Sequence, residues 1–560
     1  MLSCFCWSTD SSEPKPPFTL PSPIPKWPQG EGEGSYGQGK INLGEIQVME
    51  ITTFNLIWSS EHFSTKKGKG VAFYEPVGIP EGYFCLGHYC QPLNQPLRGY
   101  LLVAGFNPAA VVAADGEGLP ALSEPLDYTL IWRTTDHVGS CYIWFPRPPE
   151  GYKSIGFIVT SQPETPGLGE VRCVRDDLTS ACETHDLIFE SNSKKSVRVW
   201  KTRPEKRGLW ARGVSVGTFF CTETDRGPED RTIDIACLKN LDSNLTGMPN
   251  LEQVNSLVSH YGPRIFFHPN EIYMPSSVQW FFENGARIFS IKNLDGERID
   301  SNGSNLPPDG SNDGEYWIDL PKDKEKRDFI KSGNLESAEV YVHVKPALGG
   351  TFTDIVMWVF CPFNGPATIK ASVMNIKMSR IGEHTGDWEH FTLRVSNFTG
   401  ELWSMYVSQH RGGGWLDASE LEFIHGEGNR PVVYLSKSGH ACFPHAGCYI
   451  QGTTKLGIGV RNVVARSKFY IDSNARYKII AAEYLGGVVK EPHWLQYMRE
   501  WGPRELYDAW AEIDKVMSHF PLFVRFSANY FFELFPTQIY GEEGPSGPKE
   551  KDNWFGDERW

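Results

Sequence analysis

The chain has 560 residues, of which 40% are apolar and 13% aromatic, so it can bury more than one core and we expect two or three domains. Its net charge of −14 offers no attraction for phosphate backbones, which argues against nucleic acid as a partner. The 55 glycines, 39 prolines and 18 tryptophans favour short strands and many turns, so we expect a mainly β protein.

The first 45 residues show no pattern of a folded domain. Residues 1–15 lack the basic start and the apolar core of a secretory signal, and no apolar run along the chain reaches membrane-spanning length. The 12 cysteines form no CxxC framework, which is typical of reduced thiols in the cytoplasm. We therefore expect residues 1–45 to be a disordered tail or linker of a cytoplasmic protein.

Two cysteines in this tail leave two alternatives open. Cys4 and Cys6 lie beside Phe5 and Trp7, and S-acylation of both would attach the protein peripherally to an endomembrane. N-myristoylation requires glycine at position 2, where this chain has Leu2, so we expect no myristoyl group. An unmodified tail is the other interpretation.

Residues 46–240 contain an internal repeat. A tryptophan, a short aromatic strand and a Pro-Glu-Gly-Tyr turn occur in this order twice, over residues 58–83 and 132–152, and a degenerate third copy begins at Trp200. Repeats built only of strands and turns predict a β-prism-like domain with threefold internal symmetry around one shared core. A sandwich without symmetry is the alternative. The threefold interpretation predicts equivalent positions for three tryptophans: Trp58, Trp132 and Trp200.

Residues 250–540 are expected to form a β-sandwich-like domain with a few short helices. Asn250 is typical of a helix N-cap, and apolar residues at helical spacing follow it as far as residue 258. A second helix is predicted at 504–519, and the Gly- and Pro-rich segment 541–560 is predicted to be an extended C-terminal tail. The expected strands cover residues 339–345, 354–360, 391–395, 402–409 and 432–435.

The densest group of polar functional residues lies between Gly382 and His390. Asp387 and Glu389 are two residues apart at the start of an alternating strand, so both should point to the face that carries Phe391. Carboxylates at the edge of an apolar face are costly unless they are paired or bound to a cation. His384 precedes them in a glycine-flanked turn, and two further histidines end neighbouring strand-like segments: His410 and His440.

This group predicts a divalent cation bound by His384, Asp387 and Glu389. His410 and His440 are expected beside it, either as further ligands or as residues that orient a bound water or carboxylate. Two carboxylates with no cysteine nearby in the sequence favour magnesium, calcium or manganese, and the histidines also allow zinc. The alternative is a solvated turn with ordinary salt bridges.

Nearly the whole chain, from about Ile46 to its end, resembles the plant members of the vacuolar protein sorting-associated protein 62 family. The phrases that carry this resemblance are Tyr261-Gly-Pro-Arg-Ile-Phe-Phe-His-Pro-Asn-Glu271, His384-Thr-Gly-Asp-Trp-Glu-His390 and Glu542-Glu-Gly-Pro-Ser-Gly-Pro-Lys-Glu-Lys551. The family name implies a role in transport to the vacuole.

The middle segment is also similar to the necrosis- and ethylene-inducing peptide-like proteins, whose hallmark is Gly-His-Arg-His-Asp-Trp-Glu. His384 matches the first hallmark histidine, and Asp387-Trp388-Glu389 match directly, whereas Gly386 replaces the second histidine. His410 matches a later Ser-x-His, and His440 matches a His-Ala after a Val-Val-Tyr strand. The resemblance implies a β-sandwich that holds a divalent cation. An upstream aspartate of that family has only loose counterparts here: Asp354 and Asn375.

These observations favour a non-enzymatic binding protein in vacuolar or membrane trafficking, which engages a lipid headgroup, a glycan or a protein partner. The relatives with the hallmark are secreted toxins that bind plant sphingolipid headgroups, and toxicity is not implied for a chain without a secretory signal. One alternative is a metal-dependent hydrolase in which a cation activates water and His410 or His440 is the general base. Another is a purely structural metal site.

Overall fold

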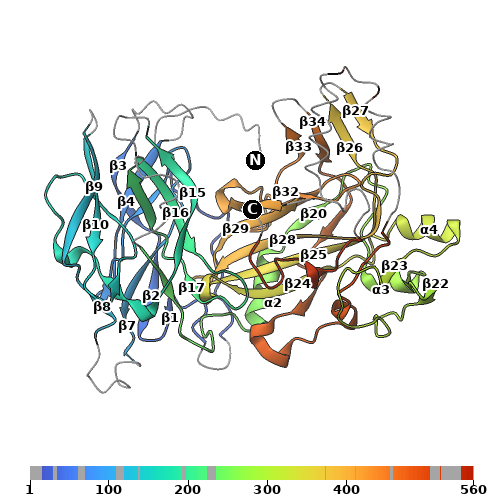
Figure 1. Ribbon diagram of the computed structural model, residues 1–560, viewed down its shortest axis with the longest axis horizontal. Helices are drawn as coiled ribbons and strands as arrows, with labels where there is room; N and C mark the ends of the chain where they lie inside the picture. The colour runs from blue at the N-terminus through green and yellow to red at the C-terminus, as the bar shows by residue number, and fades with distance from the viewer. Residues whose placement is uncertain are drawn as a thin grey trace.

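The computed structural model describes residues 16–29, 34–60, 70–108, 119–135, 139–191, 197–223, 235–371, 374–409, 412–453, 458–504 and 544–558, with Ser518 and Leu522. Figure 1 shows two β-rich parts side by side. We call residues 40–239, drawn in blue to green, the repeat unit. Residues 251–504 together with 544–558, drawn in green to red, form the sandwich unit. No described helix is long and apolar enough to cross a membrane.

The repeat unit contains three antiparallel sheets of three strands, each built from a hairpin and a third strand beside its second strand. They enclose one apolar core, to which all three sheets contribute. This arrangement is the predicted β-prism-like threefold repeat. The sheets are β3 (Phe54–Ser59), β4 (Val71–Pro76) and β6 (Tyr89–Pro92); β9 (Asp127–Thr135), β10 (Ser140–Arg147) and β12 (Ile158–Thr160); and β15 (Cys182–Glu190), β16 (Val197–Pro204) and β18 (Phe219–Glu223).

Three further sheets surround a second core of the repeat unit, so each repeat contributes to both cores. The turns that lead into them include the two Pro-Glu-Gly-Tyr phrases, where Gly82 and Gly151 have positive φ. The first sheet joins β1 (Lys40–Asn42), β2 (Ile46–Ile51), β7 (Leu101–Phe106) and β5 (Tyr83–Phe84). The others are β11 (Tyr152–Lys153), β13 (Cys173–Arg175) and β8 (Leu122–Ser123), and β14 (Thr179–Ser180), β19 (Cys237–Lys239) and β17 (Gly213–Val214).

The strand register shows which residues are equivalent in the three repeats. Trp58 pairs with Phe73 across the first hairpin and Trp132 with Ile143 across the second, each directly beside a bulge. The two indole rings meet in the shared core, 6.3 Å apart. The predicted equivalence of Trp58 and Trp132 is therefore confirmed.

The predicted place of Trp200 is wrong. The third hairpin begins earlier, with β15, and Phe189 is the residue that follows its bulge and pairs with Val199. Trp200 lies on the middle strand β16, next to Val199, and therefore points away from the core that Val199 joins. The third repeat has no Pro-Glu-Gly-Tyr turn, so the sequence offered no marker for its register.

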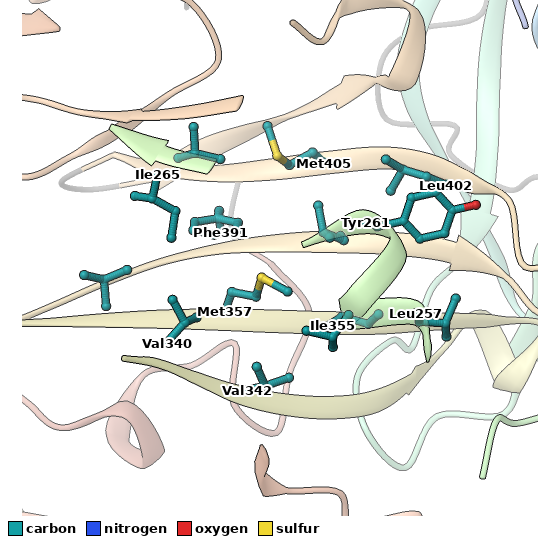
Figure 2. Packing of buried hydrophobic residues seen from close by; sticks show 14 of the residues in the cluster. Leu257, Tyr261, Ile265, Val340, Val342, Ile355, Met357, Phe391, Leu402 and Met405 are labelled. Carbon is teal, nitrogen blue, oxygen red and sulfur yellow. The ribbon is translucent and has the colours of Figure 1, made fainter. Parts of the chain in front are cut away.

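The sandwich unit packs a six-stranded sheet against a four-stranded sheet, and Figure 2 shows part of the core between them. Helix α2 (Leu251–Tyr261) covers this core, and its predicted N-cap Asn250 forms a capping box with Gln253. The large sheet has the order β30 (Gly412–Asp417), β29 (Leu402–Gln409), β28 (His384–Ser396), β25 (Phe352–Asn364), β24 (Val340–Ala347) and β36 (Tyr477–Ala481). The small one has the order β32 (Cys442–Phe443), β31 (Val432–Leu435), β20 (Arg264–Phe266) and β35 (Tyr470–Asp472).

The other face of the large sheet carries a second core, which is rich in tryptophan. Helix α3 (Val278–Glu283) and the three-stranded sheet β22 (Asn293–Arg298), β21 (Arg287–Ser290) and β23 (Tyr316–Asp319) cover it, together with α4 (Lys324–Lys331). A further sheet lies at one end of the sandwich unit: β27 (Met374–Lys377), β26 (Thr368–Ala371), β34 (Ile458–Val464) and β33 (Gly447–Thr453).

Both expected tails are packed where the structure describes them. Trp27 is buried in the core of the sandwich unit and the backbone of Ser22 is bonded to the side chain of Asn429, so the prediction of a disordered tail over 1–45 is wrong for this part. Trp554 is fully buried against the large sheet, which corrects the predicted extended tail. Apolar side chains within Pro- and Gly-rich segments find a core that another part of the chain provides. Cys4, Cys6 and residues 505–517 of the predicted second helix lie outside the described residues.

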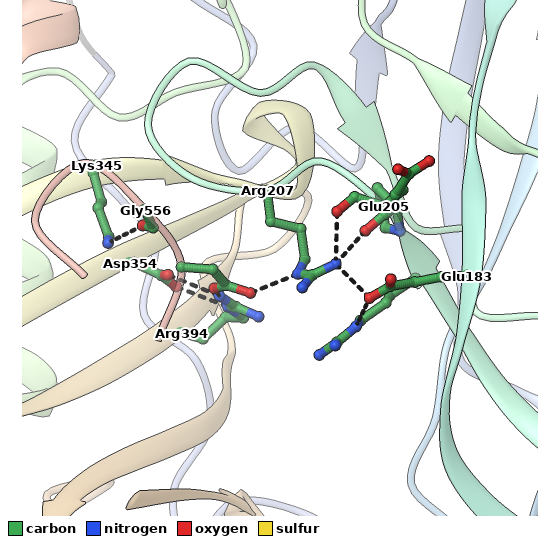
Figure 3. Close-up of polar contacts among 10 residues, drawn as sticks. Glu183, Glu205, Arg207, Lys345, Asp354, Arg394 and Gly556 are labelled. Carbon is green, nitrogen blue, oxygen red and sulfur yellow. Dashed lines mark hydrogen bonds and ion pairs between the residues drawn. The ribbon is translucent and has the colours of Figure 1, made fainter. Parts of the chain in front are cut away.

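The C-terminal segment also joins the two units. Asp557 accepts a hydrogen bond from Arg207 of the repeat unit at 2.8 Å and lies 3.5 Å from Arg394, which forms two hydrogen bonds with Asp354 (Figure 3). On the repeat-unit side, Glu183 binds the same Arg207. The segment therefore connects the large sheet to β15 by a chain of alternating charges.

Candidate functional site

Strand β28 places the two predicted carboxylates on one face. Asp387 and Glu389 alternate with Trp388, which packs in the tryptophan-rich core on the other face. They continue the row of Phe391, Leu393 and Val395 in the core between the two sheets. Asp387 is 6% exposed, so the predicted arrangement of carboxylates at the end of an apolar face is present.

His384 lies close to Asp387 because the backbone turns at Gly386, whose φ is +68°. The Nε2 atom of His384 is 3.9 Å from Oδ1 of Asp387, and its Nδ1 atom donates toward the carbonyl of Gly386 at 3.3 Å. Burial lowers the pKa of His384, so its imidazole is neutral at pH 7. A neutral imidazole next to a carboxylate oxygen is a pair of groups that one cation can share.

His440 is fully buried and uses both ring nitrogens. Nδ1 lies 2.8 Å from Oδ2 of Asp387, and Nε2 lies 2.9 Å from the carbonyl of Tyr273. Both partners are acceptors, so both nitrogens carry protons and the ring is an imidazolium. Burial by itself lowers the pKa of His440, but Cys361, Asp387 and Glu271 raise it well above its usual value.

Of the two roles expected for His440, this geometry favours orientation of a carboxylate over direct binding of a metal ion. With both nitrogens protonated, it has no lone pair for a metal ion, and it fixes the orientation of Asp387 instead. Burial acts to raise the pKa of Asp387, but the hydrogen bond from His440 holds it below its usual value. Asp387 is therefore a carboxylate at neutral pH, with Oδ1 turned toward His384.

Two residues that lie next to Asp387 and His440 were not predicted from the sequence. Cys361 lies directly opposite Asp387 on strand β25, and Cys361, Asp387 and His440 offer atoms within 4.8 Å of one another. The sequence around Asp387 contains no nearby cysteine, but the fold places Cys361 next to it. Burial raises the pKa of Cys361 to about 11, so the thiol is neutral. No sequence pattern could find it, because the register of β25 against β28 is a tertiary property.

Glu271 is the second missed residue. Its Oε2 atom accepts the backbone N–H of Ser438 at 2.7 Å and lies 4.0 Å from Nε2 of His440. Its Oε1 atom accepts the backbone N–H groups of Ile272 and Tyr273. Glu271 thereby holds the turn that presents His440. Glu271 is the last residue of the phrase Tyr261–Glu271, which carries the family resemblance. This was the one feature of the sequence that could have pointed to Glu271.

Glu389 has a different environment from Asp387. Its Oε2 atom accepts a hydrogen bond from the hydroxyl of Ser408 at 2.9 Å. Burial and the charge of Asp387 raise the pKa of Glu389 to about 8. Glu389 thus carries a proton at neutral pH unless a cation nearby displaces it. His410, the remaining predicted residue, lies outside the described residues.

His384 and Asp387 lie close enough together for one divalent cation to contact both. Bonds of about 2.0–2.4 Å from one ion can reach two atoms that are 3.9 Å apart, as His384 Nε2 and Asp387 Oδ1 are. Glu389 adds a second carboxylate on the same strand face. Oxygen donors with one imidazole suit manganese as well as magnesium or calcium, and zinc is compatible with the imidazole.

These groups border a cavity of about 300 Å³. The C-terminal segment forms one of its walls, and β26, β28 and β34 contribute others. Much of its wall consists of polar side chains that can bond a ligand: Asn364, Thr368, His384, Asp387, Glu389, His390, Tyr406, Ser408, Lys437, Arg461, Asn462, Ser546, Glu550, Lys551, Asp552, Asn553 and Glu558. The cavity can hold a small polar ligand beside the two carboxylates.

A family model described as vacuolar protein sorting-associated protein 62 matches residues 14–558. The chain belongs to the vacuolar protein sorting-associated protein 62 family. The protein of that name from Saccharomyces cerevisiae is 22% identical over 288 residues, which are 44% of this chain and 60% of the yeast protein. The chain therefore matches less than two thirds of this relative's length.

Solved structures with a similar part include GNIP1Aa from Chromobacterium piscinae, at 16% identity and a TM-score of 0.27 over 38% of this chain and 40% of that chain. Necrosis and Ethylene inducing Protein 2, from the agent of cocoa's Witches Broom disease, has 13% identity and a TM-score of 0.17, over 40% and 82%. NLPPya in complex with mannosamine has 10% identity and a TM-score of 0.20, over 41% and 76%.

Proposed function

We propose that this member of the vacuolar protein sorting-associated protein 62 family is a non-enzymatic binding protein that acts in vacuolar protein sorting. His384, Asp387 and Glu389 would hold a divalent cation, and the adjacent cavity would take a lipid headgroup or glycan. The observation that carries the proposal is the pair of carboxylates on the buried face of β28, next to a cavity lined by polar side chains. A bound cation would offset the cost of ionising Glu389 on this buried face, next to the charge of Asp387.

The state of His440 supports binding rather than hydrolysis. A general base must accept a proton, and His440 already carries one on each nitrogen, directed at Asp387 and Tyr273. The cation would supply charge for an oxygen-rich ligand, while Asp387 stays fixed by His440. The ligand would also reach Ser408 and Asn462 on the cavity wall.

Asp387→Asn is the first test, because it removes one charge and keeps the shape of the side chain. We expect elemental analysis to find a divalent metal in the wild type and much less in the variant. Added magnesium, calcium or manganese should stabilise only the wild type, by ~3 kcal/mol at a hundredfold excess over the Kd. Asp295→Asn is the matched control, because the side chain of Asp295 is 92% exposed, and its metal content should not change.

Two results would contradict the proposal. If the wild-type protein contains no metal and none of the three ions stabilises it, the proposed cation site is wrong. Metal-dependent turnover of a phosphoester or glycoside would support the hydrolase instead. Binding to glycan arrays and lipid vesicles, with and without chelator, then shows whether the ligand needs the metal.

A further inference from the structure

Three basic side chains converge on the cavity from separate segments. Lys437 comes from the turn after β31, Arg461 from β34, and Lys551 from the C-terminal segment. Lys437 is exposed, and Arg461 and Lys551 are half-buried, whereas Asp387 is buried. The basic groups therefore lie toward the solvent side of the cavity, and the carboxylates lie deeper.

Among the residues that the structure describes, no carboxylate forms an ion pair with any of the three side chains. Other basic side chains of this acidic protein are paired: Arg98 with Glu401, Arg207 with Asp557, and Lys549 with Glu491. Because partly buried cations such as Arg461 and Lys551 lose solvation, a group of three basic side chains without an ion-paired carboxylate around one cavity indicates an external anion.

Of the outer carboxylates on the cavity wall, which are Glu550, Asp552 and Glu558, two do not neutralise this group. Glu558 is held by His390 Nε2 at 2.9 Å and by the hydroxyl of Thr392. Burial raises the pKa of Glu550 to about 7, which reduces its charge at neutral pH. Lys551 acts electrostatically on Asp387 and Glu389, so it lies near the deep carboxylates.

We propose that the ligand of this cavity carries a phosphate group, which Lys437, Arg461 and Lys551 bind from the solvent side. The inference rests on the proposed function, because it names the ligand class of the same cavity. A phosphate presents several oxygens, so it can accept hydrogen bonds from a guanidinium and two ammonium groups and still face a divalent cation. A neutral sugar carries no negative charge that could compensate these three cations.

The test measures binding to full-length protein through the fluorescence of its tryptophans, one of which, Trp388, lines the cavity. The probes are inorganic phosphate, phosphatidylcholine vesicles, and the same vesicles with a phosphorylated inositol lipid. The variant Lys437→Gln/Arg461→Gln/Lys551→Gln should lose on the order of 100-fold in affinity for the phosphate-bearing probe. Lys322→Gln is the control, because the side chain of Lys322 is 70% exposed and lies outside the cavity.

The outcomes separate the two proposals. Saturation by inorganic phosphate identifies a soluble phosphate ligand, and binding only to the phosphorylated vesicles identifies a lipid; both support the inference. Equal affinities of the triple variant and the Lys322→Gln control would overturn it. So would tight binding of a neutral glycan with no response to any phosphate probe. In both cases, if Asp387→Asn still lowers the metal content, the proposed cation site remains supported.

Discussion

At the residue scale, Gly386 shows how one position shapes the site. Its φ of +68° is a left-handed conformation, and a Cβ atom built on it would lie 2.4 Å from the carbonyl oxygen of Trp501. A larger residue therefore cannot occupy this position without moving the backbone of Trp501.

Gly386→Ala should destabilise the protein by about 2–5 kcal/mol. The left-handed backbone accounts for ~1–2 kcal/mol and the overlap with Trp501 for ~1–3 kcal/mol. Gly426→Ala is the control, because Gly426 has a φ of +78° with no atom within 4 Å of a built Cβ, so it should lose only the first part. Urea denaturation measures the free energy of unfolding of both variants. Equal losses would mean that the backbone of Trp501 can move aside at no cost in stability.

At the element scale, the C-terminal segment 544–558 behaves as part of the sandwich core. Trp554 is fully buried and stacks on His343, with ring centroids 4.0 Å apart. Lys345 of β24 donates to the carbonyls of Asn553 and Gly556, the latter at 2.9 Å (Figure 3). The segment thus closes the outer face of the large sheet and brings Lys551 to the cavity.

Trp554→Ala should cost about 3–5 kcal/mol of unfolding free energy, the range for removing a large buried aromatic side chain. Trp210→Ala is the matched control, because Trp210 is 68% exposed, and its change should stay within about 0.5 kcal/mol. Thermal and urea unfolding would measure both. A small loss for Trp554→Ala would mean that the segment is only loosely attached.

At the scale of the whole molecule, the two units share a polar interface. Arg98 of the repeat unit is bonded to Glu401 at 2.8 Å and to the carbonyl of Leu402 at 2.7 Å, and it stacks on Trp403. Its side chain is 4% exposed. With Arg207 and Asp557, this arginine links the prism-like sheets to the sandwich, so we expect the units to unfold together.

Arg98→Gln should destabilise the protein by about 3–5 kcal/mol, because it leaves the partly buried Glu401 without its cation. It should also split a single unfolding transition into two, which calorimetry and near-ultraviolet circular dichroism would resolve. Arg147→Gln is the control, because Arg147 and its partner Asp127 are both at least half exposed, and it should keep the wild-type transition. Two separate transitions in the wild type would contradict the coupling.

The sequence by itself determined those features that depend on local spacing. The period of two along β28 placed Asp387 and Glu389 on one face, and Asn250 marked the start of α2. The repeated tryptophan phrase gave the equivalence of Trp58 and Trp132. Each of these inferences needs residues only a few positions apart, or a copy of the same phrase, and the physics that fixes them is contained in the segment itself.

Only the tertiary structure decided which distant groups surround the carboxylates. Cys361 reaches Asp387 through strand register, Glu271 reaches the turn of His440 across two segments, and Lys551 arrives from the C-terminal segment. The fold likewise protonates both nitrogens of His440 by directing them at acceptors, and it buries Trp554. These are long-range pairings that depend on how separate segments pack together, and no spacing along the chain records that packing.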